Sequence, residues 1–178
     1  MNFLKKIRHF YQRLFWNYEK RARYAGVNMG ENNFISSHFW SSEAYLITIG
    51  NNCSISHGVK MFTHGGGRVA RKIIPLFDIF GKIKIGNYVY IGNNSLIMPG
   101  VEIGDNVLIA AGSVVTKSVS SNMVVGGNPA RILCTTDEYI QRNKKYNLDS
   151  KGLSTEAKRK LLANLDEDKF IRKSFLKL

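Results

Sequence analysis

The fold is decided by residues 85–120, which read, in blocks of six, IGNYVY, IGNNSL, IMPGVE, IGDNVL, IAAGSV and VTKSVS. Every block begins with Ile or Val, and a Val or Ser stands four residues later. Asn, Asp and Gly fill many of the positions between them, which supplies turn chemistry once per block. A period of six fits neither a helix of about 3.6 residues per turn nor an alternating strand. It indicates a hexapeptide β-helix, in which short strands turn corners and stack coil upon coil.

The same column of inward aliphatic residues continues upstream. Ile49 and Ile55 precede Ile85 by multiples of six, and Met61 follows them. Each coil buries only its inner column, so that stability comes from the stack. We expect residues 27–48, which are rich in aromatic residues and keep the period poorly, to cap the start of the stack.

Residues 65–82 break the pattern. Ile73 and Ile79 fall in the period of six, but the segment contains three consecutive glycines, several cations and Pro75. We expect it to leave the coils as a loop, and excursions of this length in a compact domain are usually functional.

The period of six stops after Pro129. Thr135 and Glu138 form a capping box, which predicts a polar helix there, and further helices are expected near Ser154 and Asp166. The sequence thus divides into a basic amphipathic helix (1–26), a β-helix domain (27–134, with the excursion) and a C-terminal helical extension (135–178). We expect the terminal helices to cover the otherwise open last coil.

The chain is strongly basic, with 26 Lys and Arg against 13 Asp and Glu, a formal charge of +13. This favours anionic partners. Residues 1–25 carry seven of the cations and one Glu, and their apolar residues recur at steps of three and four. We expect this amphipathic helix to pack on the protein or on another subunit; peripheral contact with an anionic membrane is the second interpretation.

Cysteine usage and hydropathy predict the compartment. Two cysteines, Cys53 and Cys134, are too few for a disulfide framework, which suits a reducing environment. No apolar run approaches the roughly 20 residues that a membrane span needs. We expect a cytoplasmic protein, with the inner membrane face as the place of any peripheral contact.

The repeats, the THGGG that follows one of them, the segment IAAGSVVTKSV and the terminal GGNPAR together resemble the hexapeptide-repeat acyltransferases. The resemblance covers about residues 27–134 and is to the branch that contains maltose, galactoside and exopolysaccharide O-acetyltransferases. It implies a left-handed parallel β-helix and a homotrimer. It also implies acetyl-CoA as co-substrate, held in a cleft between two subunits.

His64 is the candidate catalytic residue, because it ends a repeat and precedes the open loop of Gly65, Gly66 and Gly67. The family's catalytic histidine occupies this position. A neutral imidazole can take a proton from a sugar hydroxyl as its oxygen attacks the thioester carbon. Without the resemblance, the default interpretation of such a histidine is a hydrogen bond to a turn.

The candidate donor site contains small residues that let a ligand approach the backbone, a hydroxyl, an amide and two cations for the CoA phosphates. Relatives use an Ala, Thr, Lys arrangement here, and a tight corner with a solvated lysine is the structural alternative. The predicted residues are Asn93, Ala111, Gly112, Thr116, Lys117 and Arg131. The chain departs from some relatives in having Cys134 where they carry a basic residue.

The acceptor side is weakly specified. Relatives often have an asparagine near the position of Ser36, where a side-chain donor helps to hold the acceptor or the developing oxyanion. Ser36 or Ser37 is the candidate to replace it here, and a donor from elsewhere in the chain is the alternative. Trp40, Arg68 and Arg71 are candidates for a sugar-binding wall; a core cap and solvated surface are their alternatives.

The resulting prediction is an acetyl-CoA-dependent O-acetyltransferase that acts on a hydroxyl of a sugar or polysaccharide precursor (capsule, exopolysaccharide or lipopolysaccharide) by direct transfer. The alternatives are a non-enzymatic β-helix scaffold and an acetyltransferase for a xenobiotic alcohol, serine or an amino sugar. No metal is expected, because a zinc site on this fold would need later histidines and none follows His64. No nucleic-acid-binding module is recognisable.

Overall fold

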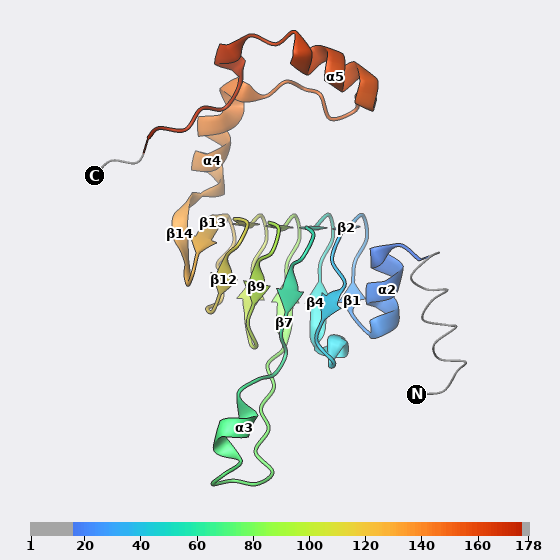
Figure 1. Cartoon of the computed structure of the whole chain (residues 1–178), viewed down its shortest axis with the longest axis vertical. Helices are drawn as coiled ribbons and strands as arrows, with labels where there is room; N and C mark the ends of the chain where they lie inside the picture. The colour runs from blue at the N-terminus through green and yellow to red at the C-terminus, as the bar shows by residue number, and fades with distance from the viewer. Residues whose placement is uncertain (1–15, 176–178) are drawn as a thin grey trace. The chain divides into compact units, whose positions relative to one another are not determined.

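A computed structural model of the chain, which describes residues 16–175, contains the predicted parallel β-helix (Figure 1). Its strands form three sheets along the stack. The first sheet contains β1 (Asn28–Met29), β4 (Ile47–Ile49), β7 (Ile83–Ile85) and β10 (Glu102–Ile103). The second contains β2 (Phe34–Ile35), β5 (Ser54–Ile55), β8 (Tyr90–Ile91), β11 (Leu108–Ile109), β13 (Met123–Gly127) and β14 (Ala130–Thr135). The third contains β3 (Phe39–Trp40), β6 (Lys60–Met61), β9 (Leu96–Ile97) and β12 (Val114–Val115).

The core is the inward aliphatic column that the sequence predicts. From Ile85 to Val115, the six residues that begin the blocks are at most 3% exposed. In the second column, Ser95 and Ser113 are fully buried, and both hydroxyls donate to the carbonyl of Ala110, at 3.0 and 2.6 Å. Buried hydroxyls with partners carry little desolvation penalty, which explains why serine is tolerated in this column.

The corners depend on asparagine. Asn52, Asn94, Asn106 and Asn122 adopt positive φ angles of 57° to 64°, a conformation that asparagine tolerates better than most residues. The crowding of Asn in the blocks is therefore explained by the turns between strands.

Residues 27–48 do not form the degenerate cap that we expected. They make a regular coil, with a strand in each sheet, because Met29 and Ile35 supply buried aliphatic side chains at the inward positions. The end of the stack is instead covered by α2 (Tyr18–Ala25), in which Ala22 is fully buried. The predicted amphipathic helix is thus described only over this part, which packs on the protein; residues 1–15 lie outside the described range.

The segment 65–82 leaves the stack after the third sheet and projects from it (Figure 1). It contains the short helix α3 (Gly67–Ala70), and Ile73 and Ile79 are 85% and 53% exposed although they share the period of six. The backbone N–H of Gly81 donates to the Thr63 carbonyl at 2.7 Å, which returns the chain to the coils.

The chain divides at Thr136 into two compact units. The second contains α4 (Thr136–Asn143) and α5 (Thr155–Ala163), together with 3₁₀ turns η2 (Lys144–Tyr146) and η3 (Glu167–Lys169). Ser154 caps α5 as predicted, but the helix expected near Asp166 is a single 3₁₀ turn. In the first unit, β14 pairs antiparallel with β13 at the last coil. Within residues 16–175, no helix has the length and hydropathy of a membrane span.

Candidate active site

His64 lies three residues after β6, where the excursion leaves the third sheet. Its backbone forms an isolated bridge with Phe80 on the returning strand, so both ends of the excursion meet beside the ring. The Nδ1 atom lies 2.6 Å from Oε2 of Glu43, and the side chain is 41% exposed. His64 is therefore held on one ring nitrogen and accessible to a ligand.

Glu43 stands in the turn before η1 (Ala44–Leu46), in the segment that links the first coil to the second. The Thr63 hydroxyl donates to the same Oε2 atom at 2.8 Å, and the Ser41 hydroxyl does so at 3.3 Å. The pKa of Glu43 is lowered to about 2, chiefly by the hydrogen bond from Thr63 and in addition by the contact with His64, against the opposing effect of burial. The carboxylate is therefore ionised at neutral pH.

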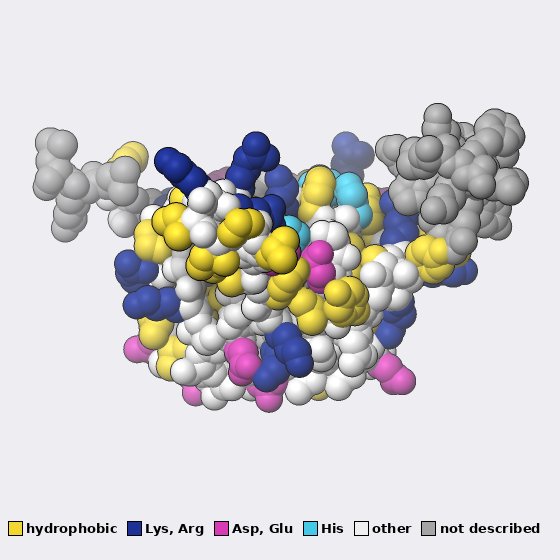
Figure 2. Space-filling model, turned by 90° about the horizontal axis from the view of Figure 1, so that it is seen from below, with side chains coloured by type: hydrophobic (Ala, Val, Ile, Leu, Met, Phe, Trp, Pro, Cys, Tyr) yellow, Lys and Arg dark blue, Asp and Glu magenta, His cyan; other side chains and the backbone are white. Residues whose placement is uncertain are grey.

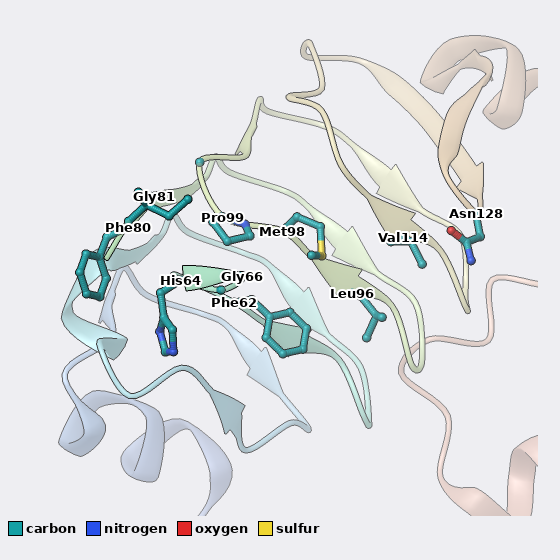
Figure 3. A pocket seen from close by; sticks show the side chains of 13 residues that line it. Phe62, His64, Gly66, Phe80, Gly81, Leu96, Met98, Pro99, Val114 and Asn128 are labelled. Atoms are coloured by element: carbon teal, nitrogen blue, oxygen red, sulfur yellow. The ribbon is translucent and has the colours of Figure 1, made fainter. Parts of the chain in front are cut away.

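A pocket of about 850 Å³ opens beside His64 (Figure 3). Its lining is mostly apolar and includes Phe62, Phe80, Leu96, Met98, Pro99 and Val114. Gly65 and Gly66 lie at the pocket, and within residues 16–175 no heavy atom beyond the adjacent residues lies within 4 Å of the position of a Cβ on either glycine. His64 therefore stands beside an apolar hollow that is open where the glycines lie.

The predicted donor residues fall into two groups on either side of β12. At one corner, the backbone N–H of Gly112 donates to the Asn93 carbonyl at 2.8 Å, so Asn93, Ala111 and Gly112 lie together. At the next corner, Thr116, Lys117 and Arg131 line a second pocket of about 500 Å³. Between them, Val114 of β12 lines the His64 pocket. An extended ligand that lies along this strand would meet both groups.

Among the described residues that line the His64 pocket, none is one of the predicted acceptor residues Ser36, Trp40, Arg68 and Arg71. Trp40 is aligned with the buried Met61 and packs against the core. Ser36 is partly buried, and Arg68 is exposed in α3. Arg71 fastens the excursion, since its Nε donates to the Phe77 carbonyl at 2.9 Å.

Sequence reasoning missed Glu43. Glu43 precedes His64 by 21 residues, which is close to the length of one coil. This spacing was the feature of the sequence that could have placed the two side chains together. Sequence reasoning also missed Phe62 and Met98, whose outward positions follow from the pleat but whose grouping with Phe80 depends on the path of the excursion. Among residues 16–175, no group of three metal-ligating side chains occurs.

These features define a class of protein, a parallel β-helix with a histidine–carboxylate pair beside an apolar pocket. Residues 82–117 match the family described as bacterial transferase hexapeptide (six repeats). Protein CapG of Staphylococcus aureus is 44% identical over 135 residues, which cover 72% of this chain and 78% of CapG. The chain belongs to this family of hexapeptide-repeat transferases, with its left-handed β-helix, and it is an acyltransferase.

Two further relatives extend the comparison. Galactoside O-acetyltransferase of Escherichia coli (strain K12) is 35% identical over 124 residues, covering 68% of this chain and 59% of that enzyme. The crystal structure of a maltose O-acetyltransferase from Clostridium difficile 630 superimposes with a TM-score of 0.57 at 29% identity, covering 74% of this chain and 83% of that one. A galactoside acetyltransferase in complex with coenzyme A gives a TM-score of 0.53 at 27% identity, over 71% and 75% of the two chains.

Proposed function

We propose that this protein transfers the acetyl group of acetyl-CoA to a hydroxyl of a sugar or polysaccharide precursor, with His64 as the general base. The observation that carries the proposal is the His64 ring, held at Nδ1 by Glu43 and exposed beside an apolar pocket. The similarity to galactoside and maltose O-acetyltransferases supports a sugar acceptor.

The chemistry is direct transfer. The Nε2 atom of His64 takes the proton of the acceptor hydroxyl while its oxygen forms a bond to the thioester carbonyl carbon. The resulting tetrahedral intermediate expels the CoA sulfur as the C–S bond breaks, and the imidazolium returns the proton to that sulfur. The products are the acetyl ester and free CoA thiol, and the histidine ends in its starting form.

We propose that the donor lies along β12, with its phosphates near Lys117 and Arg131 and its pantetheine amides at the backbone near Ala111. Both cations line one pocket, and the backbone at Gly112 is open to a ligand because no atom lies within 4 Å of the position of a Cβ there. A similar structure, a galactoside acetyltransferase, is in complex with coenzyme A.

We also propose a homotrimer with sites between subunits. The excursion exposes apolar side chains in the single chain, among them Val69, Ile73 and Leu76, at 85% exposure or more. Figure 2, which views the molecule from the side of the excursion, shows apolar side chains gathered on this face with Lys and Arg around them. Exposed apolar patches of this kind mark interaction surfaces, and a second subunit would cover this one.

The test is a thiol-release assay with acetyl-CoA and a panel of acceptors that contains simple sugars, polysaccharide fragments and a xenobiotic alcohol. Lys117→Ala and Arg131→Ala should raise KM for acetyl-CoA and leave kcat nearly unchanged, since they contact a remote part of the donor. Lys84→Ala is the matched control, because Lys84 pairs with Glu102 on the first sheet, outside the donor pocket. An equal rise in KM for Lys84→Ala would remove the donor assignment, and no acceptor-dependent thiol release would remove the function.

A further inference from the structure

We propose that Glu43 is the positioning residue of the active site: it holds the His64 ring in the tautomer with hydrogen on Nδ1, so that Nε2 faces the acceptor as a base. This inference rests on the proposed function, which it deepens. Glu43 acts through His64 and is not assigned a contact with substrate.

The hydrogen bond between Glu43 and His64 determines which ring nitrogen carries the hydrogen. An ionised carboxylate has no hydrogen to donate, so the 2.6 Å contact requires Nδ1 of His64 to be the donor. A neutral imidazole carries one N–H, which leaves Nε2 with a free lone pair. Direct transfer needs a ring nitrogen that can accept a proton. The tautomer that Glu43 stabilises provides one at Nε2.

Glu43 is itself held in place by neighbouring residues. Oε2 accepts from the Thr63 hydroxyl, and Thr63 is fully buried and adjacent to His64 in the chain. On the other side, Ala44 is 1% exposed and fixes the backbone beside Glu43. The carboxylate side chain is only 19% exposed, against 41% for the ring. The acceptor of the Nδ1 hydrogen is thus anchored by residues from two successive coils.

The negative charge of Glu43 also stabilises the protonated form of the His64 ring. When Nε2 takes the acceptor proton, the ring becomes a cation, and the carboxylate 2.6 Å away forms a charge-assisted hydrogen bond with it. The low pKa of Glu43, about 2, means that this anion is present throughout the neutral range. The Ser41 hydroxyl also approaches Nδ1, at 3.4 Å, but it bears no charge and is the weaker partner.

The direct test is the tautomer of His64, measured on the full chain by long-range ¹H–¹⁵N correlation of ¹⁵N-labelled histidine. The chain has four histidines, and the signals that disappear in His64→Ala assign the ring. We expect hydrogen on Nδ1 in the parent and a shift toward the Nε2–H tautomer in Glu43→Ala. A parent ring with hydrogen on Nε2, or a ring unchanged by Glu43→Ala, would overturn the inference.

The kinetic test separates positioning from folding. Glu43→Gln should lower kcat by roughly 10²-fold or more, as tautomer-setting carboxylates do elsewhere, with KM for acetyl-CoA unchanged. Glu43→Asp should recover part of the rate because it restores the anion, and Thr63→Val should lose less than Glu43→Gln because the carboxylate remains. Glu102→Gln, at an exposed acid of the first sheet, is the control for loss of one negative charge.

The two tests distinguish this inference from the function on which it rests. The tautomer measurement needs no acceptor, so an Nδ1–H ring in a protein without transferase activity would contradict the function alone. Conversely, His64-dependent acetyl transfer with full activity in Glu43→Gln would overturn only the role of Glu43. Circular dichroism of each variant shows whether the fold is kept.

Discussion

Substitution of Ile91 by alanine tests whether the inward column carries the stability of the coils. Ile91 is fully buried in β8, between Ile55 of the coil before it and Ile109 of the coil after it. Alanine removes three carbons, a loss of about 2.4 kcal/mol at roughly 0.8 kcal/mol per carbon, before any cavity forms. Including the cavity, we expect the free energy of unfolding to fall by about 3 kcal/mol, within the usual range of ~2–5 kcal/mol.

The matched control is Ile140→Ala. Ile140 is 50% exposed in α4 and lies outside the excursion, so we expect a change within about 0.5 kcal/mol. Urea unfolding followed by circular dichroism, at one protein concentration, measures both. A loss below about 1 kcal/mol for Ile91→Ala, or equal losses for the two variants, would refute the reasoning.

Two further predictions concern assembly and acid stability. Light scattering of the purified protein should give the mass of a trimer; an active monomer would remove the site between subunits. The folded state lowers the pKa of Glu43 from 4.5 to about 2, so its ionised form stabilises the protein fully above pH 4.5 and this stabilisation is lost as pH falls toward 2. The difference in urea midpoint between the parent and Glu43→Gln should therefore be largest above pH 4.5 and shrink below it; a difference that grows toward low pH would contradict the assignment.

The sequence predicts the coils well because a period of six is a local pattern with one structural solution. The residues that begin the six blocks, from Ile85 to Val115, are all buried as predicted. Periodicity alone fails for Ile73 and Ile79, and the glycines and proline around them were needed to assign the excursion. The weak periodicity of residues 27–48 predicted a degenerate cap, but the buried side chains of Met29 and Ile35 are sufficient for a coil there.

The site was only partly predictable, because it combines residues from different coils. His64 was predicted from its position after a repeat and from the resemblance of the sequence to the family, whereas Glu43 contacts it only because the first and second coils stack. Trp40, for which sugar binding and a core cap were the two interpretations, packs against the core. The C-terminal helices carry no period that relates them to the β-helix, so their covering of the last coil stays a prediction.

The central claim is that His64 is the base, and the measurement that tests it most directly compares turnover with donor binding in His64→Ala. A positioned general base contributes roughly 10² to 10⁴ in rate, so we expect kcat on a genuine acceptor to fall by that factor. Binding of acetyl-CoA, measured by calorimetry, should stay within about twofold of the parent, because the proposed donor contacts lie on β12 and its two corners. Full turnover in His64→Ala would contradict the account.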